Sequence, residues 1–173
     1  MVKQNGENLM HYILSILIEN EPGALSRVIG LFSQRGFNIE SVTTAPTEDP
    51  TMSRMTIKTT GDAHVLEQIQ KQLHKLVDVY RVYDLTEGPH VEREIMLIKI
   101  AAKGSQAREE VKRCVDIFRG SIVDVKATQY IVQLVGTSEK LASFLAAIRE
   151  TCEVIEMVRS GIVGLSRSDK SSK

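Results

Sequence analysis

Residues 11–36 read HYILSILIENEPGALSRVIGLFSQRG, and this stretch decides the fold. Residues 11–19 form an almost unbroken run of apolar and β-branched side chains, which is typical of a buried strand. The turn Asn20-Glu21-Pro22-Gly23 ends that run. The apolar residues after the turn recur at the spacing of one helix face: Leu25, Val28, Ile29 and Phe32. The stretch therefore predicts a strand, a tight turn and a helix that ends at Gly36.

The next residues extend this pattern to a complete unit. Residues 37–44 and 52–59 are predicted strands on either side of a loop, Ala45–Pro50, whose two prolines interrupt any ladder. Asp62 is a favourable N-cap for a second helix. The stripe of that helix consists of Leu66, Ile69, Leu73 and Leu76. With a last strand at 77–85 the order is β-α-β-β-α-β, the ferredoxin-like split βαβ.

The same order begins again after a compact linker, Thr86–His90. Strands are predicted at 95–101, 121–126, 130–135 and 152–159, with one amphipathic helix after the first of these strands and another after the third. We therefore predict an α+β chain of two tandem ferredoxin-like βαββαβ units. The N-terminal domain is expected over 10–86 and the C-terminal domain over 92–165, with flexible tails at 1–9 and 166–173.

Composition limits the classes of function. The 22 basic residues balance the 22 acidic residues, so a nucleic-acid-binding protein with a net basic surface is disfavoured. No stretch approaches the roughly 20 apolar residues that a membrane-spanning helix needs, and residues 1–8 lack the apolar region of a signal peptide. Cys114 and Cys152 lie far apart and form no C-x-x-C motif, which indicates reduced thiols. A soluble, cytoplasmic protein is expected.

The first strand has two apolar faces. One face carries Tyr12, Leu14, Ile16 and Ile18, and the other carries Ile13 and Leu17 around Ser15. A single small unit cannot bury both faces, and exposed apolar patches usually mark partner surfaces. We expect the N-terminal unit to pair with a second copy of itself or with another subunit.

A search for catalytic residues and metal ligands finds none. The histidines are not spaced along the sequence as the ligands of a metal site are: they lie at His11, His64, His74 and His90. No nucleophile elbow, P-loop or dinucleotide fingerprint is present, and no carboxylates form an evident pair. The chain is therefore predicted to be a non-catalytic protein without a metal or cofactor of its own.

The turn Asn20–Leu25 permits two interpretations. Pro22 and Gly23 can serve only the backbone, as a strand end followed by a helix start. Alternatively, the helix N-terminus offers unpaired N–H groups to a carboxylate, Gly23 allows close approach to the backbone, and Asn20 offers an amide to both charged groups of a free amino acid. The residues alone leave both interpretations open.

The segment ILSILIENEPGALSRVIGLFSQRGFNIESVTTAPTEDPTMSRMTI resembles the small, regulatory subunits of acetolactate synthase, whose first half is an ACT domain. The likeness continues through LEQIQKQLHKLVDVYRV, HVEREIMLIKI, IFRGSIVDV and SGIVGLSR, so it covers residues 10–170. The resemblance implies a subunit that activates a separate catalytic chain and confers feedback inhibition by valine in branched-chain amino acid biosynthesis. Thiamine diphosphate, Mg²⁺ and FAD are then expected on the catalytic subunit.

The resemblance also implies a site and a dimer. ACT domains of this family pair side by side, and valine binds between the two chains. By motif matching, the valine-binding residues are Asn20, Gly23, Ala24 and Leu25 from one chain and Asn38 and Ile39 from its partner. The polar loop Pro46–Ser53 is the candidate contact with the catalytic subunit.

Three alternatives stay open at this point. An ACT-type sensor of another amino acid would use the same pocket residues. A small enzyme such as an acyl-phosphate hydrolase needs an arginine at the first turn, whereas Arg27 lies inside the helix. An RNA-binding module of similar topology needs aromatic residues on its central strands, and Tyr12 is the single candidate on the first strand.

Overall fold

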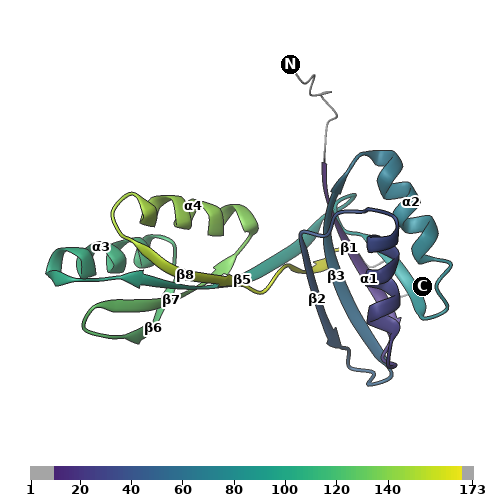
Figure 1. Cartoon of the computed structure of the whole chain (residues 1–173), viewed down its shortest axis with the longest axis horizontal. Helices are drawn as coiled ribbons and strands as arrows, with labels where there is room; N and C mark the ends of the chain where they lie inside the picture. Colours follow the sequence, from purple (N-terminus) through teal and green to yellow (C-terminus); the bar gives the residue numbers. More distant parts are fainter. Residues whose placement is uncertain (1–9, 169–173) are drawn as a thin grey trace, which may run out of the picture. The chain divides into compact units, whose positions relative to one another are not determined.

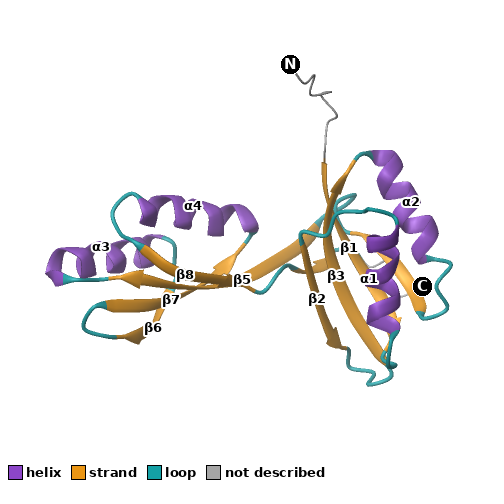
Figure 2. Cartoon of the chain, in the orientation of Figure 1, coloured by secondary structure: helices purple, strands orange, loops and turns teal. Residues whose placement is uncertain are grey.

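The computed structural model describes residues 10–168, which form two compact units (Figure 1). One unit contains the residues up to Val91 and those from Ile162 on. The other unit is Glu92–Gly161. Each unit combines a mainly antiparallel sheet with two helices, which confirms the predicted α+β class (Figure 2).

The first unit follows the predicted β-α-β-β-α-β order. Its elements are β1 (Met10–Glu19), α1 (Ala24–Gln34), β2 (Ser41–Pro46), β3 (Met52–Gly61), α2 (Ala63–Leu73) and β4 (Val79–Asp84). The sheet order is β2-β3-β1-β4 with antiparallel neighbours, so β2 and β4 are the edges. Both helices pack on one face of this sheet (Figure 2).

The second unit repeats this topology. Its elements are β5 (His90–Ala101), α3 (Gly104–Ile117), β6 (Ser121–Val125), β7 (Gln129–Gly136), α4 (Ser138–Arg149) and β8 (Val154–Arg159). The strand order β6-β7-β5-β8 is that of the first sheet, element for element. Its core is equally aliphatic, with Phe144 as the largest fully buried side chain among the described residues of this unit.

The alternation along β1 explains where the first core lies. Leu14 and Ile16 are fully buried beneath the helices, together with Val28 and Phe32 of α1 and Ile69 of α2. Burial of one such aliphatic side chain contributes about 1.5–3 kcal/mol, so this layer dominates the stability of the unit. The amphipathic stripes identified in the sequence are therefore the core-facing sides of both helices.

The other face of β1 is covered in part by the C-terminal segment of the same chain. Ile13, Leu85 and Ile162 form a small separate cluster, and all three side chains are buried. An additional strand, β9 (Val163–Ser166), follows and pairs with β5. Chain-internal burial thus accounts for part of the apolar surface that the sequence attributes to a partner.

This segment changes two of the predicted boundaries. The C-terminal domain was expected to continue to 165, but residues from Ile162 on belong to the first unit. Residues 166–168 were expected in a flexible tail, yet Ser166 ends β9 and the Arg167 amide donates to the Pro89 carbonyl at 2.8 Å. The expected tails at 1–9 and 169–173 lie outside the described residues.

Strand β2 begins later than the sequence predicts. Residues 37–40 form a connection instead of a strand, because Phe37 turns inward and packs edge-on against Phe32, with ring centroids 6.0 Å apart. The strand then includes Pro46, which an edge strand tolerates because its missing N–H is not needed in the ladder.

Candidate functional site

The turn between β1 and α1 is built on a left-handed glycine. Gly23 is the N-cap residue of α1 with φ +91°, a conformation that side chains with a Cβ rarely adopt. Ala24 is buried in the core and its amide donates to the Glu21 carbonyl at 3.2 Å. Leu25 is 41% exposed, so its side chain is available to a ligand or a partner.

Arg27 occupies the space beside Gly23. A Cβ at Gly23 would lie 2.8 Å from Nη1 of Arg27. The sequence suggested that a ligand could approach the backbone closely at Gly23, but on this side the guanidinium of Arg27 fills that space. Arg27 also donates from Nε and Nη2 to Asp78, at 2.5 and 2.6 Å. These hydrogen bonds lower the pKa of Asp78, although burial acts in the opposite direction.

Sequence reasoning missed this ion pair. Arg27 and Asp78 are separated by 51 positions, and no local pattern connects a helix residue with the residue before a later strand. A basic residue one turn after a helix-starting glycine was the single available signal. The pair matters to the site because Asp78 also accepts, through its carbonyl, the Glu19 amide at 2.9 Å, and thereby fixes the end of β1.

The N-terminus of α1 has no side-chain cap, whereas that of α2 has one. Asp62 accepts the Val65 amide at 2.7 Å, as the sequence predicted. At α1 the N-cap is Gly23, which has no side chain to offer. Apart from the Ala24 amide, which donates to Glu21, the first turn of α1 therefore presents its amides and the positive end of its dipole without a side-chain cap, as a carboxylate site requires.

Asn20 ties the turn to the loop between β2 and β3. Its Nδ2 donates to the Pro50 carbonyl at 2.9 Å, and its Oδ1 accepts from Ser53 Oγ at 3.0 Å. The backbone N–H of Asn20 also donates to the Thr51 carbonyl at 2.8 Å. Each side-chain atom keeps one further hydrogen-bonding position, so Asn20 both fixes the loop and can contact a ligand.

Asn38 and Ile39 lie at the opposite end of the sheet. Asn38 is exposed and donates to Thr60 Oγ at 3.0 Å, and Thr60 pairs with His11 near the start of β1. Ile39 is half-buried against the core. Because Asn20 follows the other end of β1, the two groups are separated by roughly 30 Å along the strand. The structure does not bring the six predicted residues together within one chain.

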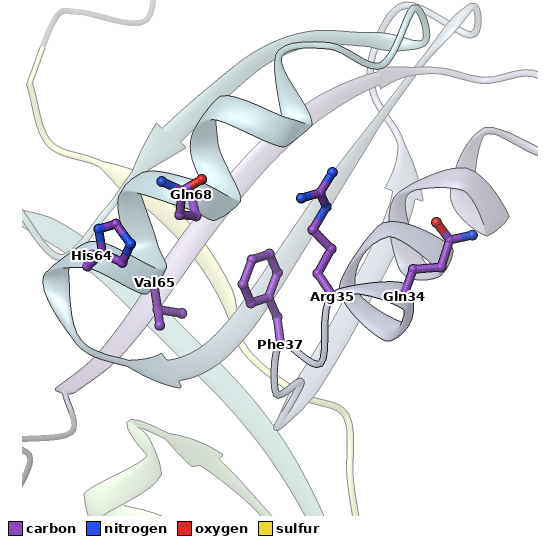
Figure 3. A pocket seen from close by; sticks show the side chains of 6 residues that line it. All are labelled: Gln34, Arg35, Phe37, His64, Val65 and Gln68. Carbon is purple, nitrogen blue, oxygen red and sulfur yellow. The ribbon is translucent and has the colours of Figure 1, made fainter.

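Two grooves border the helices. One lies between the end of α1 and the start of α2 and is lined by Gln34, Arg35, Phe37, His64, Val65 and Gln68 (Figure 3). None of the six predicted residues lines it. The other runs between the two helices and includes Gly23 beside three cations, Arg27, Arg35 and Lys75.

The described part of the chain offers little else of chemical interest. Within residues 10–168 no group of three or more His, Cys, Asp or Glu side chains is placed to hold a metal ion. No helix in that range is long and apolar enough to cross a membrane. Both cysteines are free, and burial raises the pKa of Cys114, which makes it a poor nucleophile.

Comparison with known proteins agrees with this architecture in both halves. Residues 14–81 match the family model of the AHAS small subunit-like ACT domain. Residues 93–168 match the model described as the small subunit of acetolactate synthase. The second match includes Ile162 and β9, the segment that packs on the first unit.

Individual relatives match over nearly their full length. The acetolactate synthase isozyme 3 small subunit of Salmonella typhimurium is 68% identical over 93% of this chain and 98% of its own. The acetolactate synthase small subunit of Haemophilus influenzae is 59% identical over 94% and 99%. The crystal structure of the small subunit from Thermotoga maritima covers 92% of this chain and 99% of its own, at 37% identity and a TM-score of 0.81. The chain therefore belongs to the family of acetolactate synthase small subunits, the regulatory subunits that carry an ACT domain.

Proposed function

We propose that this subunit activates a catalytic subunit of acetolactate synthase and makes it sensitive to valine, which binds between two copies of the ACT unit. Thiamine diphosphate, Mg²⁺ and FAD then reside on the catalytic chain. The proposal assigns valine sensing and dimerisation to residues 10–86 and a cytoplasmic place in branched-chain amino acid biosynthesis.

The distance between the two groups of predicted valine-binding residues is the observation that supports the proposed dimer. Residues 20–25 span the start of α1 and residues 38–39 follow its end, at opposite ends of one sheet. A two-fold axis that sets α1 beside its copy in antiparallel orientation brings residues 20–25 of one chain to residues 38–39 of the other. The edge strand β2 and the exposed side chains of Leu25 and Val42 supply surface for that pairing.

The chemistry of the two halves suits a free amino acid. The uncapped start of α1 attracts the carboxylate, and the amides of Asn20 and Asn38 supply acceptors for the ammonium group. Leu25 and Ile39 offer apolar contact to an aliphatic side chain. Hydrogen bonds of about 1 kcal/mol each favour an affinity in the micromolar range or weaker, which is appropriate for a metabolite sensor.

Asn20 provides a route from this site to the catalytic partner. It holds the backbone of Pro50 and Thr51 in the loop that we propose as the contact with the catalytic subunit. A ligand that binds Asn20 thereby favours one arrangement of this loop. Inhibition then follows as a population shift, since valine binds more tightly to the subunit arrangement with lower activity.

Titration of the purified chain with valine, leucine, isoleucine and lysine tests the ligand. Saturable binding of valine by the dimer is expected. Binding of lysine but not valine would assign the chain to a different ACT sensor.

Mixed dimers test the division of the site between chains. The variants Asn20→Ala and Asn38→Ala should each lose valine binding, because every site in either homodimer has one defective half. In a dimer of one copy of each, one site combines two native halves. Mixing the variants should therefore restore roughly a quarter of the sites. No recovery after verified exchange of subunits would contradict a site shared between chains.

A further inference from the structure

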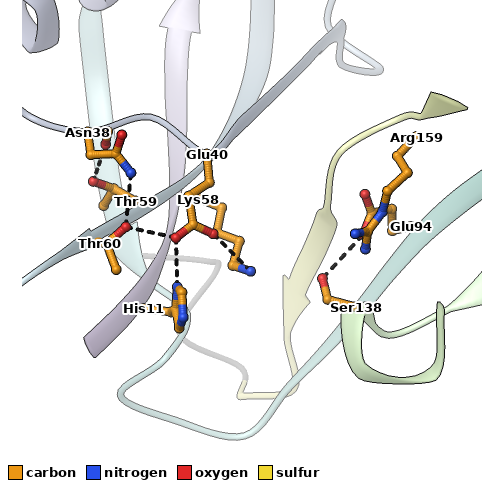
Figure 4. Close-up of polar contacts among 9 residues, drawn as sticks. All are labelled: His11, Asn38, Glu40, Lys58, Thr59, Thr60, Glu94, Ser138 and Arg159. Atoms are coloured by element: carbon orange, nitrogen blue, oxygen red, sulfur yellow. Dashed lines mark hydrogen bonds and ion pairs between the residues drawn. The ribbon is translucent and has the colours of Figure 1, made fainter. Parts of the chain in front are cut away.

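A chain of hydrogen bonds runs from Asn38 to Glu40 through Thr60 (Figure 4). Nδ2 of Asn38 donates to Thr60 Oγ at 3.0 Å, and Thr60 Oγ donates to Glu40 Oε1 at 2.7 Å. Thr59 Oγ donates to the carbonyl of Asn38 at 2.5 Å and fixes its backbone. The three residues that these hydrogen bonds link, Asn38, Glu40 and Thr60, come from the α1–β2 connection and from the end of β3.

The chemistry of Glu40 sets the direction of this chain. An ionised carboxylate only accepts hydrogen bonds, so the single hydroxyl hydrogen of Thr60 is committed to Glu40. Thr60 can then only accept from Asn38. The amide of Asn38 must therefore turn its NH₂ group toward Thr60 and its Oδ1 away from it.

Lys58 and His11 both lie against the carboxylate of Glu40, and Lys58 supplies the positive charge that keeps it ionised. Nζ of Lys58 lies 3.0 Å from Oε2, and Nδ1 of His11 lies 2.8 Å from Oε1. Burial acts to raise the pKa of Glu40, but the hydrogen bonds from Thr60 and Lys58 and the nearby positive charges outweigh it and lower that pKa. The carboxylate thus stays an acceptor throughout the neutral range.

We infer that Glu40 is a positioning residue for the effector site: it orients the Asn38 amide so that Oδ1 faces the α-ammonium group of the bound amino acid. The inference rests on the proposed function, because Asn38 contacts the ligand only in the shared site of the dimer. Glu40 itself touches no ligand, and its effect passes through the hydroxyl of Thr60.

Glu40→Gln tests which groups donate in these hydrogen bonds. The Gln side chain can donate to Thr60, whose hydroxyl is then free to donate to Asn38 Oδ1 and to turn the NH₂ group toward the ligand. Calorimetric titration should show valine binding weakened roughly tenfold or more. Glu67→Gln is the matched control, since it removes the same charge from an exposed position on α2 and should bind valine like the wild type.

Thr60→Val gives a second variant that keeps the shape of the side chain and removes the relay. It should weaken valine binding as well, with thermal unfolding used to confirm that both variants are folded. The NMR resonances of the Asn38 side-chain NH₂ group should also shift in Glu40→Gln and in Thr60→Val, and should not shift in Glu67→Gln. A purely structural role of Glu40 does not predict this change at the Asn38 amide.

The reciprocal variant makes the test specific. Asn38→Asp alone places an acceptor against the Thr60 oxygen and should bind valine poorly. In the Glu40→Gln background the same aspartate can accept from Thr60 and keep its other oxygen for the ammonium, so the double variant should bind more tightly than either single variant. If wild type and Glu40→Gln bind valine equally well, the role of Glu40 is contradicted and the proposed function is unaffected. If the wild type does not bind valine, both the role of Glu40 and the proposed function are contradicted.

Discussion

The guanidinium of Arg27 clamps the carboxylate of Asp78 across the start of α1, with donor–acceptor distances of 2.5 Å from Nε and 2.6 Å from Nη2. The Asp78 side chain is 6% exposed and that of Arg27 is 48% exposed. Through the Asp78 carbonyl the same residue holds the Glu19 amide at the end of β1. One buried acid therefore fixes both sides of the turn that begins the proposed valine site.

Asp78→Asn should lower the melting temperature by several degrees, because the buried acceptor loses its charge and one of its two hydrogen bonds to Arg27. Glu67→Gln, which breaks the exposed pair with Lys71, should leave the melting temperature nearly unchanged. Thermal unfolding followed by circular dichroism measures both. Equal shifts for the two variants would contradict a structural role for the Arg27–Asp78 pair.

The same pair predicts a dependence of stability on pH. The pKa of Asp78 is lowered in the folded state, so its contribution is fully present above its unfolded pKa of about 3.9. The contribution is lost as the pH falls through the lowered value. Wild type should therefore lose more stability than Asp78→Asn between neutral pH and about pH 2 in urea titrations, and parallel curves would refute the assignment.

Two glycines of the α1 region allow a matched test of backbone strain. Gly23→Ala forces a Cβ into a left-handed conformation and against Nη1 of Arg27, so we expect a loss of about 1 kcal/mol in the free energy of unfolding. Gly30 lies within α1, and nothing lies within 4 Å of an added Cβ there. Gly30→Ala should gain about 0.5–1 kcal/mol from helix propensity. Urea unfolding at one protein concentration distinguishes the opposite signs.

Much of the fold could be predicted because it depends on local pattern. The apolar run of β1, the helix stripes and the Asp62 cap are all encoded within a few residues, and the repeated order follows from them. Strand β9 and the early start of β5 could not be predicted in this way. Each depends on pairing with a segment far away in the sequence, and the isolated residues carry no strand signal strong enough to show it.

The site shows the same division. The sequence located the turn at Asn20 and Gly23, because proline, glycine and a following stripe mark a helix start. It could not show that Asn20 is already bonded to the β2–β3 loop, or that Arg27 fills the space beside Gly23. Both facts require the tertiary fold, since the partners lie on different elements or turns.

The C-terminal segment provides a fourth prediction. Ile162 is 3% exposed in its cluster with Ile13 and Leu85, whereas its neighbour Val163 is 51% exposed. Ile162→Ala should cost about 2–3 kcal/mol and leave a cavity on the sheet face opposite the helices. Val163→Ala should stay within about 0.5 kcal/mol. Hydrogen exchange at Leu85 and along β9 should accelerate in the first variant only, and protection retained in both would mean that the segment does not cover the sheet.

A fifth prediction concerns a buried carboxylate in the second unit. Glu94 is 6% exposed and accepts from Arg159 Nη2 at 2.5 Å and from Ser138 Oγ at 3.2 Å (Figure 4). Arg159→Met leaves this carboxylate without its counter-charge, so we expect a loss of about 2 kcal/mol. Lys99→Met, which breaks the pair with the exposed Glu156, is the control and should cost under about 0.5 kcal/mol beyond lost packing.

The double variant Glu94→Gln/Arg159→Met separates charge from shape in this cluster. The neutral Gln still accepts from Ser138 and leaves no buried charge unpaired, so the double variant should be more stable than Arg159→Met alone. Hydrogen exchange of the β5 and β8 amides reports the stability of this unit by itself. A double variant that is less stable than Arg159→Met would show that Arg159 acts by packing, because removal of the Glu94 charge would then bring no relief.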